Sequence, residues 1–233
     1  MENRAYRSAI FYLRSRLSKT EIRLITKWGL IVAVLTLLYW PFTLRPRHRI
    51  RNAVSLQECA ADPYCAPNLS IIKLRLIVAN PDTPSYFDPV YRFLRGEGYQ
   101  PDFRLPGYGI VYGFFYMISK SRFWAFWGTA IFQFCMWCLA LALWLTEAEK
   151  RGVPKTFIYI ITVLICFSPI AFYTRALLTE ALSVSMGLLA LYALYKRHYV
   201  CAGIAVGWAF FMRPVLGVWL LPGTLWIIYR ERP

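Results

Sequence analysis

The chain has 233 residues, of which 58% are hydrophobic and 18% aromatic, and its 27 Lys and Arg against 12 Asp and Glu give a formal net charge of +15. This composition excludes a disordered chain, which requires low hydrophobicity, and a soluble globular domain, which could not bury so much apolar surface. It predicts an all-α, polytopic integral membrane protein whose arginines flank the spans and meet anionic lipid head groups.

The first 27 residues are basic, and their apolar residues share one helical face. This pattern predicts that residues 1–27 form a cytoplasmic amphipathic leader lying on the membrane surface. Ser18 and Glu21 have the spacing of a capping box, which predicts the start of a helix leading into the first span.

Apolar runs predict the organisation of the rest of the chain. The first transmembrane helix is expected at 28–44, and residues 45–104 form a large outer loop with short helices. Residues 105–233 form a membrane helical bundle, and the total comes to about 5–7 transmembrane helices of roughly 20 residues or somewhat less. The apolar runs of this bundle are Leu105–Ser119, Phe123–Leu145, Phe157–Tyr173, Ala181–Tyr195, Tyr199–Met212 and Val215–Tyr229.

The positions of the basic residues predict the orientation in the membrane. The leader and two basic loops, 150–155 and 196–198, lie on the cytoplasmic side by the positive-inside rule. The arginines within 45–51 oppose this orientation, because they follow the first span on the outer side. The orientation requires 105–145 to cross the membrane once in net, so Leu105–Ser119 is predicted to be a re-entrant or interfacial helix.

Several charged residues then collect on the outer side of the membrane. Asp88 and Arg104 lie in the outer loop, Arg175 and Glu180 lie between two spans, and Arg213 separates two short apolar runs. Arginines bind phosphate oxygens in a bidentate manner, and a carboxylate can accept a proton from a hydroxyl group. An ionisable residue at membrane depth, such as Arg213, is by itself a hypothesis of a functional site.

Most of these residues also have a purely structural explanation. Asp88 precedes Pro89, and Asp-Pro is common in turns and at helix starts. Arg104 can extend its guanidinium to the membrane surface from a helix end. Glu180 falls in the first turn of a predicted helix, where an acid complements the helix dipole.

The order of these motifs resembles the N-terminal part of the GT-C glycosyltransferases, which use a sugar linked to polyprenyl phosphate. This superfamily includes protein O-mannosyltransferases and lipid A aminoarabinose transferases. Asp88–Tyr91 resembles the acidic and aromatic motif of their outer loop, and Arg104–Tyr108 resembles their basic, Pro- and Gly-containing entry into the membrane. Glu180 and Arg213 resemble later acidic and basic positions, whereas Pro89 replaces a second acidic residue that is frequent in the family.

The resemblance implies an inverting transfer of a sugar from a polyprenyl-phosphate donor to an acceptor hydroxyl at the periplasmic or lumenal face. The acceptor would be a glycan, a lipid or a protein, and the membrane would be a bacterial inner membrane or the endoplasmic reticulum. Asp88 would act as the general base. The donor phosphate would be bound by Arg104, Arg213 and Arg175. The acceptor would be positioned by Glu180, Tyr91 and Tyr108. The family usually has more spans, so a truncated or minimal catalytic module is expected.

Other functions stay open at this point. A transporter or flippase of lipid-linked sugars, or a non-catalytic membrane protein, would also carry such charges. Nucleic-acid binding is not expected, because the basic residues are spread among span ends. No cofactor or metal is expected, since Cys135 and Cys138 lack a second ligand pair. Cys59 and Cys65 form a disulfide or stay unpaired, depending on whether their loop faces an oxidising compartment.

Overall fold

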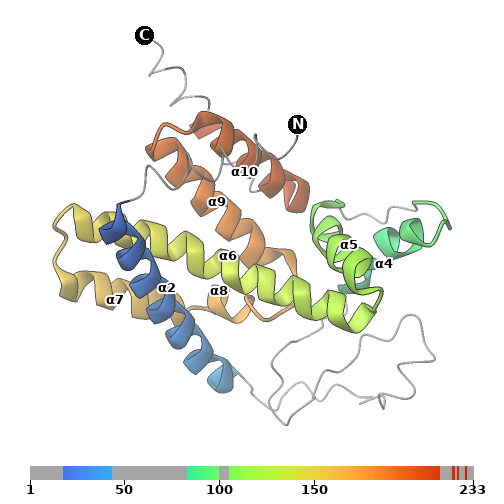
Figure 1. The fold of residues 1–233 in the computed structure, drawn as a ribbon, viewed down its shortest axis with the longest axis horizontal. Helices are drawn as coiled ribbons and strands as arrows, with labels where there is room; N and C mark the ends of the chain where they lie inside the picture. The colour runs from blue at the N-terminus through green and yellow to red at the C-terminus, as the bar shows by residue number, and fades with distance from the viewer. Residues whose placement is uncertain are drawn as a thin grey trace.

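The computed structural model describes residues 18–43, 83–99 and 105–215, with 222, 223, 225 and 229 (Figure 1). This part of the chain is all-α, as the sequence predicts. Its helices are α2 (Lys19–Tyr39), the 3-10 helix η1 (Trp40–Thr43), α4 (Thr83–Leu94), α5 (Gly107–Ser119), α6 (Arg122–Lys150), α7 (Lys155–Cys166), α8 (Pro169–Phe172), α9 (Thr179–Tyr195) and α10 (Tyr199–Met212).

Local sequence signals explain where these helices begin and end. The predicted capping box is confirmed: Ser18 Oγ accepts a hydrogen bond from the Glu21 amide, and the Glu21 carboxylate accepts one from the Ser18 amide. Helix α2 therefore starts within the basic leader and runs without a break into the predicted span. Pro169 divides the apolar run Phe157–Tyr173 into α7 and α8, because proline is favoured in the first turn of a new helix.

Helix α6 is the longest helix of the described residues, and α2, α5, α7 and α9 pack on it (Figure 1). Helix α2 packs on its C-terminal part, where the Trp137 indole donates to Thr36 Oγ1 over 3.3 Å. The buried residues Trp28, Val32 and Ile158 fill this interface together with α7. The C-terminal part of α6 is thus the centre of a helical bundle.

Helices α4 and α5 pack at the other end of α6 (Figure 1). The Phe87 and Tyr112 rings stack here with 4.5 Å between their centroids. Glycine allows the helices to approach closely: a Cβ on Gly109 would lie 2.5 Å from the Tyr86 carbonyl oxygen. Helix α5 and the start of α6 form a hairpin, which begins beside the last turn of α10, where a Cβ on Gly107 would meet the Phe211 backbone.

Two described helical segments, Lys19–Tyr39 and Trp124–Lys150, are long and apolar enough to cross a membrane, as judged from length and composition. Three shorter helices, α7, α9 and α10, are also apolar. Large apolar side chains on α7 and α10 are exposed, including Leu164, Val200 and Ile204. Most of the last predicted apolar run, Val215–Tyr229, lies outside the described residues.

Candidate functional site

A cavity of about 590 Å³ lies where the start of α9 meets the end of α10. Its lining is mainly apolar, but one acidic and one basic side chain reach it. Helix α4 contributes Tyr86 to the wall, and Leu105 contributes from just before α5. Its lining includes Tyr86, Leu105, Tyr173, Glu180, Ser183, Arg213 and Val215.

Arg213 lies at the end of α10 and reaches across the cavity to α9. Its Nη2 donates to Glu180 Oε1 over 2.6 Å, and its Nε donates to Thr179 Oγ1 over 3.1 Å. The backbone of Arg213 is extended, with φ −146° and ψ 104°, because the following Pro214 disfavours a helical conformation. Pro214 therefore ends α10 at the residue that delivers the guanidinium to the cavity.

Glu180 is the second residue of α9, where the helix dipole favours a negative charge. Arg213 binds one of its carboxylate oxygens. The other oxygen, Oε2, is buried and accepts no hydrogen bond from the described residues. A buried acceptor without a donor costs free energy, so a ligand that supplies a hydroxyl group would be stabilised at this oxygen.

Two residues that the sequence analysis did not select complete this wall of the cavity. Thr179 Oγ1 accepts from Arg213, and it also lies 3.5 Å from the Tyr86 hydroxyl on α4. Neither residue carries a charge, so the pattern of charged residues in the sequence does not point to them. Their contacts join α4, α9 and α10 at one point.

Arg175 and Tyr108 lie near the cavity but do not line it. The Arg175 side chain is buried, with its guanidinium 5.0 Å from the centre of the Phe172 ring. Burial lowers the pKa of Arg175 to about 10, which leaves it charged at neutral pH. Tyr108 is fully buried and donates its hydroxyl hydrogen to Gln133 Oε1 over 2.9 Å.

Asp88 does not line the cavity and belongs to a second cluster. Its Oδ1 accepts a hydrogen bond from Arg122 Nη2 over 2.9 Å, and both side chains are largely buried. The Arg122 guanidinium also stacks on the ring of Tyr91, 4.6 Å from its centroid. Burial raises the pKa of Asp88, although the charges of Arg122 and Arg92 act against this rise.

The structure thus brings two of the predicted site residues, Glu180 and Arg213, into direct contact. Asp88 and Tyr91 share a different cluster through Arg122. The predicted Asp-Pro pair is not at a turn, because Pro89 lies inside α4. Arg104 and the two predicted disulfide partners, Cys59 and Cys65, lie outside the described residues.

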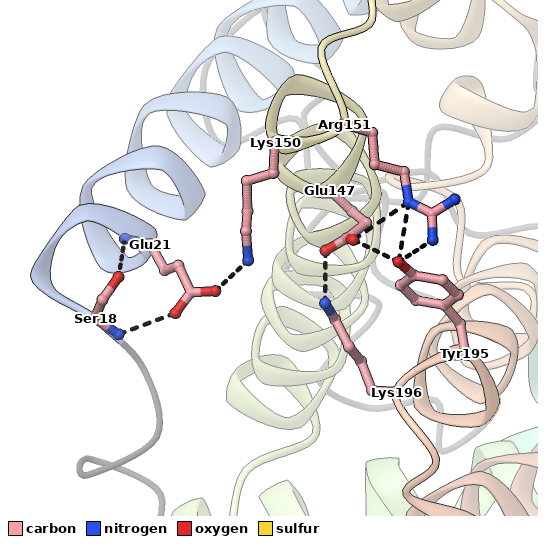
Figure 2. Close-up of polar contacts among 7 residues, drawn as sticks. All are labelled: Ser18, Glu21, Glu147, Lys150, Arg151, Tyr195 and Lys196. Atoms are coloured by element: carbon pink, nitrogen blue, oxygen red, sulfur yellow. Dashed lines mark hydrogen bonds and ion pairs between the residues drawn. The ribbon is translucent and has the colours of Figure 1, made fainter.

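A charged cluster lies at the opposite end of α9 (Figure 2). Glu147 accepts from Lys196 Nζ and from the Tyr195 hydroxyl, each over 2.6 Å. Glu21 forms an ion pair with Lys150. The start of α2 and the ends of α6 and α9 therefore meet here. We call this group, with Arg151, the charged cluster.

Glu147 lies beyond Leu145, where the predicted span ends. Two opposing effects act on its pKa. Burial raises this pKa, but hydrogen bonds from Lys196 and Tyr195 outweigh burial and lower it from 4.5 to about 2. A carboxylate whose pKa falls on folding stabilises the protein above its unfolded pKa. This contribution is full above about pH 4.5 and is lost as the pH falls towards 2.

Replacing Glu147 with Gln should therefore destabilise the bundle at neutral pH by about 2 kcal/mol, because charged hydrogen bonds are lost. The thermal midpoint in detergent measures this effect by circular dichroism. The difference between the variant and the unmodified protein should shrink when the pH is lowered from 6 towards 3. A difference that stays constant over this pH range would contradict the assignment.

Gln133 is the third residue that the sequence analysis did not select. It is a polar residue within the long apolar run Phe123–Leu145, and its side chain is fully buried. A polar group in such a place needs partners, so its position was a usable signal. Gln133 Nε2 donates to the carbonyl oxygens of Tyr173, Thr174 and Ala176.

Within the part of the chain that the structure describes, no three His, Cys, Asp or Glu side chains gather as a metal site requires. The polar groups of the cavity lining are one arginine, one carboxylate and the hydroxyl groups of Tyr86, Tyr173 and Ser183, and Thr179 adjoins them through Arg213. Comparisons of the chain with protein-family models, with curated proteins and with solved structures gave no match.

Proposed function

We propose that the chain is a polytopic membrane protein with its charged cluster on the cytoplasmic side and its cavity on the outer side. The start of α2 and the ends of α6 and α9 meet in the charged cluster (Figure 2). Basic loops follow α6 and α9, and such loops favour the cytoplasmic side. Arg213 and Glu180 lie at the opposite end of α9. The exposed apolar side chains of α7 and α10 then face lipid.

The arrangement of α5 agrees with a single net crossing by residues 105–145. Helix α5 begins beside the end of α10, on the side of the cavity, and leads through a short turn into α6. Helix α6 then returns along α5 and continues to the charged cluster. We infer that α5 lies at the outer face and that α6 crosses inwards.

Labelling of an introduced cysteine tests this topology. In a background without the native cysteines, Cys at Ser121 should react with a membrane-impermeant thiol reagent from the outer side, because the turn between α5 and α6 faces outwards. Cys at Arg197 should react only after the membrane is opened, since it adjoins the charged cluster. Labelling of the Ser121 position from the cytoplasmic side would disprove the proposed orientation.

We propose further that the cavity binds a polyprenyl-phosphate-linked sugar. Arg213 supplies a guanidinium to a mainly apolar cavity, and a guanidinium binds phosphate oxygens through charge-assisted, bidentate hydrogen bonds. The Arg213 side chain is 41% exposed and remains accessible to a ligand. The Arg213–Glu180 pair in this cavity is the observation on which the proposal rests.

In the proposed reaction the sugar is transferred from the lipid phosphate to an acceptor hydroxyl. The acceptor oxygen forms a bond to the anomeric carbon as the bond between that carbon and the phosphate oxygen breaks. The lipid phosphate leaves with the electron pair, and Arg213 stabilises its charge. We assign the acceptor proton to the Glu180 carboxylate, because Glu180 lines the cavity and its Oε2 has no donor among the described residues.

Asp88 is the base that the resemblance to GT-C enzymes implies, and this assignment stays a prediction. For Asp88 to act, its ion pair with Arg122 would have to open and its carboxylate would have to reach the cavity. Glu180 also forms an ion pair, with Arg213, but it already lines the cavity. The geometry therefore favours Glu180 as the proton acceptor.

Purified protein in sealed vesicles, supplied with a polyprenyl-phosphate-linked radiolabelled sugar, distinguishes the remaining functions. A glycosyltransferase releases free polyprenyl phosphate and moves the label to an acceptor from a membrane extract. A flippase moves the intact donor across the bilayer without changing it. A non-catalytic protein does neither, and either of these last two results would overturn the proposed reaction.

A further inference from the structure

The segment between α8 and α9 contains buried carbonyl groups that no helix satisfies. It runs from Tyr173 to Leu178 and leads directly into Glu180. Gln133 Nε2 donates to the carbonyl oxygens of Tyr173 over 2.7 Å, Thr174 over 3.0 Å and Ala176 over 2.9 Å. The two N–H groups of one buried amide on α6 therefore hold three carbonyl groups between residues 173 and 176.

The orientation of this amide is fixed from its other side. The Tyr108 hydroxyl donates to Gln133 Oε1 over 2.9 Å, and both side chains are fully buried. An amide whose oxygen already accepts a hydrogen bond presents its N–H groups in the opposite direction, towards the segment. The Tyr108–Gln133 contact thus links α5 to the carbonyl groups before α9.

The segment held by Gln133 also positions the two charged groups of the cavity. Tyr173 lines the cavity at one end of the segment, and Thr179 and Glu180 follow at the other end. Arg213 donates hydrogen bonds to both of these α9 residues, so the position of its guanidinium depends on the position of the α9 N-terminus. A displacement of the segment would move both charges.

We propose that Gln133 is a positioning residue, which fixes residues 173–178 and thereby sets the geometry of the Arg213–Glu180 pair for its phosphate ligand. The identity of the ligand rests on the proposed function, whereas the fixing of residues 173–178 by Gln133 does not. The Tyr108 hydroxyl acts through Gln133, to which it donates, whereas the Tyr108 ring contacts Tyr86 and is kept in Tyr108→Phe.

The test compares Gln133→Met, which keeps the volume but removes the donor, with Tyr108→Phe, which keeps the Gln133 donors and removes one hydroxyl. Trp137→Phe is the matched control. Trp137 lies one turn further along α6, is also buried, and donates to Thr36 in the α2 interface, away from the cavity. The readouts are the thermal midpoint, amide hydrogen exchange of 173–178, and affinity for undecaprenyl phosphate.

We expect Gln133→Met to speed exchange in 173–178 and to weaken undecaprenyl phosphate binding about tenfold. The carbonyl groups of Tyr173 and Thr174 lose the Gln133 donor, and that of Ala176 keeps the Leu178 amide. Tyr108→Phe should show the same pattern to a smaller extent. Trp137→Phe should lower the thermal midpoint without either effect. In the transfer assay, the Gln133 variant should also lower kcat, because Glu180 and Arg213 move together.

If the loss of affinity in each of the three variants is proportional to the decrease in its thermal midpoint, the loss reflects stability alone, and the positioning role is overturned. Unchanged exchange in 173–178 in the Gln133 and Tyr108 variants would also overturn it. If the unmodified protein does not bind undecaprenyl phosphate, the proposed function fails, but the exchange measurement still decides whether Gln133 holds the segment. Normal binding without any response of the segment would overturn the inference and leave the proposed function standing.

Discussion

Arg213→Gln should weaken binding of undecaprenyl phosphate at least tenfold, about 1.4 kcal/mol or more. The guanidinium is the basic group on the cavity wall, and glutamine keeps polar atoms there but removes the charge. The variant also leaves Glu180 without its ion-pair partner, so the carboxylate opposes the approach of a phosphate. Both effects act in the same direction.

The measurement is a titration of the protein in detergent, followed by native mass spectrometry. Arg151→Gln is the matched control, because it removes an arginine from the charged cluster at the other end of the molecule. It should bind the lipid as the unmodified protein does. Equal affinity of the Arg213 variant and the unmodified protein would remove Arg213 from the donor site.

Glu180→Gln should abolish sugar transfer while donor binding is kept. Loss of a general base typically lowers a rate by about 10² to 10⁴. Glutamine has nearly the same shape as glutamate and can still accept from Arg213, but it cannot take a proton from the acceptor. Donor binding should stay equal or increase, since the negative charge beside the phosphate is gone.

Asp88→Asn is the comparison that decides between the two carboxylates. It should weaken the contact with Arg122 and lower thermal stability, but transfer should continue. The reverse outcome, with transfer lost in Asp88→Asn and kept in Glu180→Gln, would identify Asp88 as the base. Transfer that continues in both variants would mean that neither of them is the base.

The apolar runs and the prolines predicted most of the helices. The runs that became α5, α6, α9 and α10 match their helices to within a few residues, because helix length follows the apolar segment and its caps. The capping box at Ser18 and the break at Pro169 depend on neighbouring residues alone. Such local features are readable from sequence.

The sequence did not predict which charged side chains form ion pairs. Arg213 meets Glu180 because α9 and α10 are antiparallel, and the distances along the helices decide which residues face each other. Asp88, the general base that the family resemblance implies, is paired with Arg122 across α4 and α6. These pairs depend on helix packing, which a single sequence does not specify.

Two residues that were predicted to bind a ligand are buried instead and do not line the cavity. Tyr108 and Arg175 belong to plausible motifs, but both side chains are buried and absent from the cavity wall. Gln133 is a polar residue in an apolar run, so the sequence predicts that it has hydrogen-bond partners but does not identify them. The partners are backbone carbonyl groups, which carry no sequence signal at all.

Photo-crosslinking most directly tests whether the cavity is the donor site. Polyprenyl phosphate with a diazirine beside the phosphate is irradiated with the protein, and mass spectrometry of the peptides locates the adducts. We expect adducts on cavity residues such as Ser183 and Val215, removed by unlabelled lipid and much reduced in Arg213→Gln. Adducts confined to other surfaces, or unaffected by the Arg213 variant, would contradict the proposed donor site.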